Sequence, residues 1–161
     1  MKLAKLNEED LLYVADNMRD CDRREIFATR WDDDPYPLVK TILALGEFGW
    51  VAGTDVPIAA FGAIPTWNGV WQVWMFATDR WPEVGLGVTR FIKRVMIPAL
   101  QDIGAHRAEC RSIEGHTTAH RWLECLGAHK ESEIPNFGRN GETFYLYSWL
   151  APVSRPQSQE N

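Results

Sequence analysis

The sequence has few cysteines, no long apolar run and no excess of positive charge. Its three cysteines, Cys21, Cys110 and Cys125, lie far apart without a CxxC pair, so we expect reduced thiols in an intracellular protein. No stretch approaches the roughly 18 apolar residues of a membrane span. Residues 1–10 also hold no apolar segment ahead of their acidic residues, which excludes a signal peptide pattern. We therefore expect a soluble protein with no membrane partner.

Charge and size narrow the function classes further. Seventeen lysines and arginines against 22 aspartates and glutamates give a net charge of -5, which argues against a nucleic-acid binder that relies on phosphate contacts. The chain has 161 residues, 45% of them hydrophobic, enough for one domain with a buried core. We expect that domain to span residues 1–150 and a disordered Pro/Ser/Gln-rich tail to follow at 151–161.

The N-terminal segment shows helical spacing after a short strand expected at Leu3–Leu6. Asn7 precedes three acidic residues, a pattern typical of a helix start because acids favour the positive end of the helix dipole. The apolar spacing continues, with a bend, to Phe27. A second helix is predicted from Pro37, since proline suits a first helical position, to a stop at Gly46.

The period of the apolar residues changes after Gly46. Short apolar runs over 48–53, 56–66 and 70–78 predict three antiparallel strands joined by tight turns. In the third run both alternating sets of side chains are mostly apolar, so each face of this strand should be covered. We therefore expect the strand at 70–78 to lie at the centre of the sheet.

Helical spacing returns at Gly85 and continues to Ile103, with a kink expected at Pro98. Further elements are predicted as a strand at Arg107–Ile113, a helix at Thr117–Leu126 and strands at Ala128–Ile134 and Glu142–Trp149. The whole order of elements predicts a single mixed α/β domain built on one sheet.

A glycine-bearing turn, ATDRWPEVGLGV, connects the third strand to the long helix. Its glycines, Gly85 and Gly87, permit close approach of a ligand and unusual dihedral angles, and the first turn of a helix offers unpaired N–H groups. We predict an anion cradle over residues 84–89, with a plain loop and helix cap as the alternative. A missing third glycine excludes a Rossmann fingerprint, and the absence of GK[ST] excludes a P-loop.

The element order and this turn resemble the GCN5-related N-acetyltransferase (GNAT) family, over nearly the whole chain from Leu3 to Trp149. The family's glycine signature matches Gly85 and Gly87, whereas Pro82 stands where Gln or Arg is usual. The resemblance implies acetyl-CoA as co-substrate, with its pyrophosphate at the turn and its pantetheine arm on the third strand, and an amine or protein acceptor. The cofactor-binding residues that it implies are Phe76, Ala77, Thr78, Val84, Gly85, Leu86, Gly87, Val88 and Thr89.

The catalytic residues of the family are largely replaced. A later GNAT pattern, Asn followed by Ala, Tyr and a closing Gly, falls on HTTAHRWLECLG, where His116 takes the Asn position. Leu123 takes the position of the Tyr that protonates the departing CoA thiolate, and leucine cannot supply a proton. The Glu that often serves as general base on the central strand is missing. An active enzyme still needs a proton acceptor, so His116 and Asp79 are the candidate catalytic residues, with Glu109 and Glu114 as further candidates.

A narrower resemblance rests on ADNMRDCDRREI, on Leu123 and on the LGA ending of the later helix. These features resemble the GNAT-like morphogenesis proteins of short-tailed phages, sometimes labelled internal virion protein A, in which the acetyltransferase signature is often eroded. The resemblance implies a protein of the cytoplasm of a phage-infected bacterium or of the virion, with virion or host proteins as partners. Two functions stay open: an acetyltransferase acting on an amine, and a catalytically inactive virion or morphogenesis protein.

His116, His120 and Glu124 follow one another at intervals of four, a spacing that metal ligands can have. Residues eight apart rotate away from each other on a helix, so the third side chain would have to reach far. We interpret the three as a solvated helix face and predict no metal site.

Overall fold

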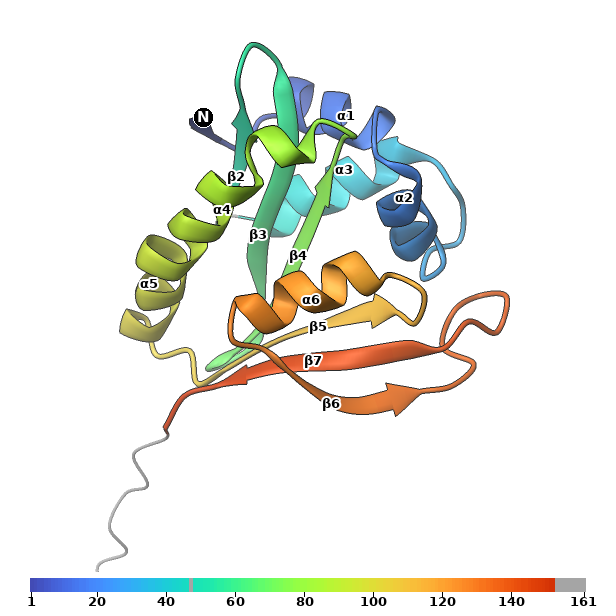
Figure 1. The fold of residues 1–161 in the computed structure, drawn as a ribbon, viewed down its shortest axis with the longest axis vertical. Helices are drawn as coiled ribbons and strands as arrows, with labels where there is room; N and C mark the ends of the chain where they lie inside the picture. Colours follow the sequence, from blue (N-terminus) through green and yellow to red (C-terminus); the bar gives the residue numbers. More distant parts are fainter. Residues whose placement is uncertain (47, 153–161) are drawn as a thin grey trace, which may run out of the picture.

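One mixed sheet of seven strands, with helices on both faces, forms the protein (Figure 1). The computed structural model describes residues 1–46 and 48–152, so most of the tail predicted at 151–161 lies outside the described residues. The strand order is β1-β2-β3-β4-β5-β7-β6. The predicted mixed α/β fold on a single sheet is therefore confirmed, and β4 lies at its centre as expected.

The N-terminal half follows the predicted order with one change. Its elements are β1 (Lys2–Lys5), α1 (Glu8–Asp16), α2 (Asp20–Phe27), α3 (Pro35–Leu45), β2 (Phe48–Gly53), β3 (Pro57–Trp67) and β4 (Val70–Ala77). Asn7 caps α1 by accepting a hydrogen bond from the Asp10 N–H at 2.9 Å. The bent helix expected up to Phe27 is two helices, because the linker at Met18 forms a bridge with Thr78 instead of continuing the helical ladder.

The C-terminal half contains the predicted long helix in three consecutive pieces. Its elements are a 3-10 turn (Trp81–Glu83), α4 (Gly85–Phe91), a π-helical segment (Ile92–Met96), α5 (Ile97–Asp102), β5 (Arg107–Ile113), α6 (Thr117–Cys125), β6 (His129–Ile134) and β7 (Phe144–Leu150). The π-helical segment comes directly before Pro98, which has no N–H for the helical ladder. Among the described helices, none is both long and apolar enough to cross a membrane.

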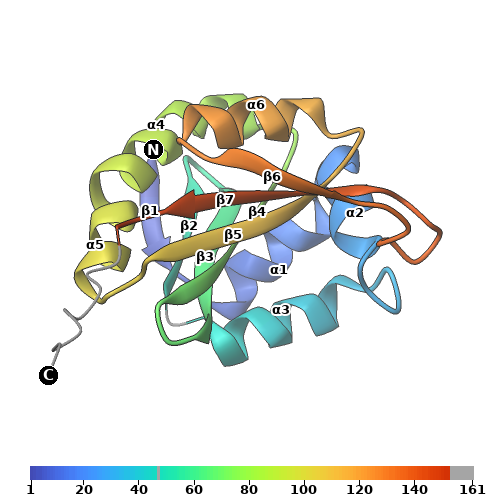
Figure 2. The same cartoon turned by 90° about the horizontal axis from the view of Figure 1, so that it is seen from below.

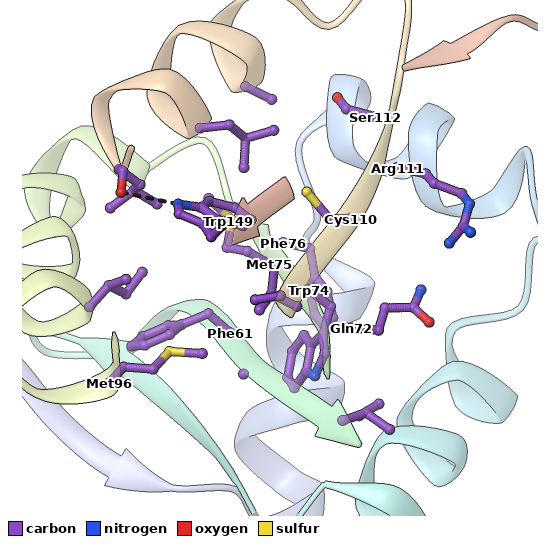
Figure 3. A pocket seen from close by; sticks show the side chains of 18 of the residues that line it. Phe61, Gln72, Trp74, Met75, Phe76, Met96, Cys110, Arg111, Ser112 and Trp149 are labelled. Atoms are coloured by element: carbon purple, nitrogen blue, oxygen red, sulfur yellow. Dashed lines mark hydrogen bonds between the residues drawn. The ribbon is translucent and has the colours of Figure 1, made fainter. Parts of the chain in front are cut away.

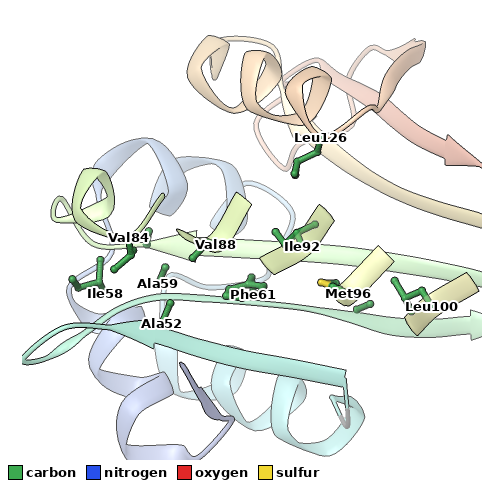
Figure 4. Close-up of a cluster of buried hydrophobic side chains, with 12 residues drawn as sticks. Ala52, Ile58, Ala59, Phe61, Val84, Val88, Ile92, Met96, Leu100 and Leu126 are labelled. Atoms are coloured by element: carbon green, nitrogen blue, oxygen red, sulfur yellow. The ribbon is translucent and has the colours of Figure 1, made fainter. Parts of the chain in front are cut away.

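Two layers of helices enclose the sheet (Figure 2). The helices α1 and α3, with part of α2, pack on one face in a cluster that includes Leu11, Val39 and Phe76. The helices α4 and α5 pack on the other face, where Val88 and Phe61 belong to a second cluster (Figure 4). On that same side α6 covers β5 and β7 (Figure 2). Both faces of β4 are thus covered, as its two apolar sets predicted.

The core on the α1 side should control stability. Leu11 is 0% exposed, so Leu11→Ala is expected to lower the free energy of unfolding by about 2–5 kcal/mol through lost apolar burial and a residual cavity. Tyr13→Ala, at a 41% exposed position of the same helix, should change it by less than about 0.5 kcal/mol. Urea unfolding followed by circular dichroism measures both values; equal losses would contradict this assignment of the core.

Candidate functional site

A split between β4 and β5 opens the centre of the sheet. These strands pair in parallel only where Val70–Gln72 faces Arg107–Glu109, whereas β5 pairs with β7 over its full length. Beyond the third pair the two strands separate, and a cavity of about 730 Å³ extends between them. Figure 3 shows Met75 on β4 and Cys110 and Ser112 on β5 among the side chains that line it.

The backbone of β4 presents alternate residues to this split. Because the Thr78 N–H donates to Ile58 O on β3 at 2.8 Å, the backbone groups of Thr78 and Phe76 face β3, and those of Ala77 and Met75 face the split. The Ala77 groups are already bonded to the α2 region, so the expected contact of Phe76–Thr78 with a pantetheine arm needs correction. Met75, which has no partner on β5, has backbone groups that face the split.

The α2 region holds the end of β4 from the side of the split. The Asp22 carboxylate accepts a hydrogen bond from the Ala77 N–H at 2.8 Å. The Arg19 N–H donates to the Ala77 carbonyl at 2.9 Å. Burial raises the pKa of the Asp22 carboxyl, and its hydrogen bond and ion pair with the Arg19 side chain oppose that effect. The linker between α1 and α2 thus fills the split beside Ala77, at the carboxyl end of β4. We call this the inner end of the split.

The glycine turn begins α4 with two residues that have no side chain. Gly85, Leu86 and Gly87 form the first turn of this helix, so their N–H groups have no partner inside it. Neither glycine has a positive φ, which excludes the expected unusual dihedral angles as their reason for being glycine. A Cβ added at Gly87 would lie 2.6 Å from Sδ of Met1, and one at Gly85 would lie 2.9 Å from the Trp81 ring. The two glycines therefore allow the side chains of Met1 and Trp81 to pack against the start of α4.

The other predicted cradle residues have different surroundings. Val84 and Val88 are buried in the core beneath α4 and serve its packing, while the Leu86 side chain is 64% exposed. The hydroxyl of Thr89 donates to the Gly85 carbonyl at 2.7 Å and accepts a hydrogen bond from Nε1 of Trp122 at 2.9 Å. This second bond ties α6 to α4 beside the turn.

Arg80 braces the turn from outside. Its guanidinium pairs with Asp55 and Glu83, each at 2.7 Å, and the hydrogen bonds from Arg80 hold the pKa of both carboxyls below its usual range. Trp81 meets the ring of Trp122 edge-on, with 5.4 Å between the ring centroids. Contacts with the loop before β3 and with α6 therefore hold the turn in place.

A buried histidine lies where α2, β5 and α6 meet. His116 is 5% exposed and lines the cavity. Its Nδ1 lies 3.1 Å from Oε2 of Glu25. The same Oε2 accepts hydrogen bonds from the Ser112 hydroxyl at 2.6 Å and from the Ile113 N–H at 2.8 Å. Glu25 therefore holds the ring with Nδ1 as the protonated nitrogen.

The second ring nitrogen of His116 is free to accept a proton. Nε2 has no hydrogen-bond partner among the described residues, and its nearest acid is Oδ1 of Asp22 at 3.5 Å. Because Asp22 also bonds Ala77, the histidine lies at the inner end of the split. His116 is thus a possible base, Glu25 is the carboxylate that orients its ring, and Asp22 is a second carboxylate that can stabilise a positive ring.

The other predicted catalytic residues lie elsewhere. Asp79 is exposed in the turn after β4 and does not line the cavity. Glu109 pairs with Arg107 at 2.6 Å, and Glu114 accepts a hydrogen bond from the Tyr145 hydroxyl. Leu123 does line the cavity, so the position that carries a proton-donating Tyr in the resembling family is apolar here. Of the predicted candidates only His116 faces the split.

The acids around His116 were not identified from the sequence. Asp22 and Glu25 are three residues apart on α2, so they share one face of that helix, and this spacing was the available signal. The expected solvated face of α6 was wrong for both histidines, since His116 and His120 are buried, with His120 Nε2 at 3.0 Å from the Ile113 carbonyl oxygen. Residues of α2 lie against His116, β5 and β7 cover His120, and of the three only Glu124 is exposed.

No protein-family model matches the sequence, and no curated protein matches it either. Solved structures do. The protein yncA of Salmonella typhimurium, solved with its cofactor acetyl-CoA, superposes with a TM-score of 0.69 at 15% identity, covering 98% of each chain. A GNAT-family acetyltransferase of Bacillus anthracis gives 0.68 at 14% identity, covering 92% of this chain and 93% of the other. The fold is the GNAT fold.

A third similar structure is an acetyltransferase that is named for a protein acceptor. The ribosomal-protein-S18-alanine N-acetyltransferase of Escherichia coli matches with a TM-score of 0.64 at 16% identity, over 97% of each chain. The fold predicted from the element order is thereby confirmed. The narrower resemblance to phage morphogenesis proteins gains no support from these structures and stays a prediction.

Proposed function

We propose that this protein binds acetyl-CoA, or a related acyl-CoA, along the split between β4 and β5 and transfers the acyl group to an amine. The observation that carries the proposal is the position of His116. It lies at the inner end of the split, with Nδ1 bonded to Glu25 and Nε2 unpartnered among the described residues. At the outer end the first-turn N–H groups of α4 are available to a pyrophosphate.

The proposed reaction needs one proton acceptor and one proton donor. The amine nitrogen attacks the thioester carbonyl carbon, and its proton passes to Nε2 of His116. The carbon–sulfur bond then breaks, and the imidazolium returns the proton to the CoA thiolate. Glu25 stabilises the positive ring through Nδ1, as a carboxylate does in other histidine-based acyl transfers. His116 thus supplies the proton that Leu123 cannot supply.

Neighbouring cavity groups are less suited to proton transfer. Burial raises the pKa of the Cys110 thiol well above its usual range, so this thiol holds its proton too firmly to donate it to a thiolate. Ser112 donates its own proton to Glu25. Compared with Cys110 and Ser112, His116 has both a free lone pair on Nε2 and a carboxylate, Glu25, bonded to Nδ1.

Calorimetry and a release assay test the proposal on the full chain. Titration with acetyl-CoA is expected to show one site per chain. A DTNB assay should then detect free CoA with at least one member of a panel of small amines, polyamines and a peptide with an N-terminal alanine, the last chosen because the matched Escherichia coli protein is named for an alanine acceptor. Absence of both binding and release would overturn the proposal.

A catalytically inactive role, as a phage virion or morphogenesis protein in an infected bacterium, is the second candidate. The contacts of Ala77 favour it, because Asp22 and Arg19 already occupy backbone groups at the inner end of the split. Leu123 favours it too, since it removes the family's usual acid. The same two measurements separate the candidates: turnover with any amine contradicts the inactive role, and no binding with no turnover leaves it standing.

A further inference from the structure

We propose that Cys21, Asp22 and His116 form a binding site for a divalent metal ion of the zinc class. One ligand atom from each, Sγ, a carboxylate oxygen and a ring nitrogen, lies within 4.8 Å of the others. Oδ1 of Asp22 is 3.5 Å from Nε2 of His116 and 3.8 Å from Sγ of Cys21. Zinc bonds of about 2.0–2.3 Å place neighbouring tetrahedral ligand atoms about 3.3–3.8 Å apart. Two of the three edges therefore fit a tetrahedral site, and the third, between Cys21 and His116, lies within 4.8 Å.

The free nitrogen of His116 is the second observation that points to a cation. Nε2 has no hydrogen-bond partner among the described residues. The side chain is only 5% exposed, so bulk water does not supply a partner either. Since Nδ1 donates to Glu25, Nε2 carries a lone pair, and it faces the lone pairs of Oδ1 of Asp22. Two buried acceptors that face each other need a proton or a metal ion between them. A divalent ion meets that need and adds Cys21 as third ligand.

The surroundings orient these ligands as a metal site requires. Glu25 accepts from Nδ1 of His116, the carboxylate contact that commonly fixes a metal-binding imidazole. On Asp22, Oδ2 is held by Arg19 at 2.7 Å and by the Ala77 N–H, which leaves Oδ1 for a metal. Once a metal displaces the proton of Cys21, its thiolate and the carboxylates of Asp22 and Glu25, against the charge of Arg19, give a net of two negative charges to balance a divalent ion.

The ligand set selects the class of metal. One thiolate, one imidazole and one carboxylate suit zinc or cobalt(II) better than magnesium or calcium, which prefer oxygen ligands alone. Three protein ligands leave the fourth tetrahedral position for water or another ligand. Cys21 is exposed, so an ion can enter from solvent. A metal on Nε2 excludes a proton there, so metal occupancy and the proposed base role of His116 are alternatives at that atom.

Cobalt(II) titration of the full chain, stripped with a chelator, tests the site. One equivalent is expected to bind and to produce the near-ultraviolet absorption of a cobalt–thiolate bond together with tetrahedral visible bands. Cys21→Ser should remove the near-ultraviolet band and weaken affinity at least tenfold. Cys125→Ser is the matched control, because Cys125 is also an exposed free cysteine outside the cluster, and it should bind like the unchanged chain.

A variant of Glu25, which positions the His116 ring, provides a second test of the site. Glu25→Gln should keep the cobalt–thiolate band and weaken binding by about 10–100-fold, as loss of such carboxylate contacts does in other metal sites. Circular dichroism verifies that each variant is folded. Failure of the unchanged chain to bind one equivalent of cobalt(II), or an unaltered spectrum and affinity in Cys21→Ser, would overturn the proposal.

Discussion

Replacing Gly87 with phenylalanine is expected to abolish acetyl-CoA binding while the protein stays folded. The benzyl group would displace the Met1 side chain and crowd the N–H groups of Gly85, Leu86 and Gly87, where we place the pyrophosphate. The backbone tolerates the change because Gly87 does not have a positive φ. The nearest atom to an added Cβ is Sδ of Met1, the end of a flexible side chain that can move aside.

Calorimetry measures this effect directly. The dissociation constant for acetyl-CoA should rise at least about 100-fold, which at 1.4 kcal/mol per tenfold is about 2.8 kcal/mol. Val95→Phe is the matched control: Val95 is 46% exposed on the same long helical run, away from the turn, so it should bind as the unchanged protein does. Undiminished affinity in Gly87→Phe, with a normal circular dichroism spectrum, would remove the turn from the binding site.

His116→Asn is expected to lower kcat for acetyl transfer by about 10²–10⁴-fold, the usual contribution of a general base. The asparagine amide can still donate to Glu25 in place of Nδ1, but it offers no basic nitrogen at the position of Nε2. The contacts with CoA that we propose along the glycine turn are left intact by this substitution. The affinity for acetyl-CoA should therefore stay within about threefold while turnover falls.

Separate measurement of binding and turnover makes this prediction specific. His129→Asn is the control, since His129 is exposed on β6 and bonds Ser148 away from the cavity; its kcat should remain near that of the unchanged protein. Thermal unfolding must show that His116→Asn is folded. A kcat reduced by less than about threefold would mean that another group accepts the amine proton.

The sequence by itself determined the order of elements and hence the fold. The two apolar sets of β4 indicated its central position, because a strand covered on both faces carries apolar side chains on both. Asn7 marked the start of α1 through a local cap. The run from β4 through Gly85 and Gly87 into α4 was likewise local. Signals of this kind can be read in order along the chain because the interacting residues are close in sequence.

Only the tertiary structure decided which side chains form the site. Asp22 and Glu25 reach His116 across more than ninety positions of the chain, at 3.5 and 3.1 Å, because α2 packs against the open edge of β4 and the end of β5. That packing also buries His116, which the sequence places on a polar-looking helix. It excludes Asp79, which lies near β4 in the sequence but outside the cavity.

The difference has one physical reason. Helices, turns and strand order follow from local periodicity and capping, which act over a few residues. Proton acceptors and metal ligands depend on burial and on contacts between distant segments, and these exist only once the sheet has split between β4 and β5 and α2 has closed its inner end. The sequence thus determined the fold and the glycine turn, and the folded chain decided that His116, held by Glu25 and facing Asp22, is the centre of the site.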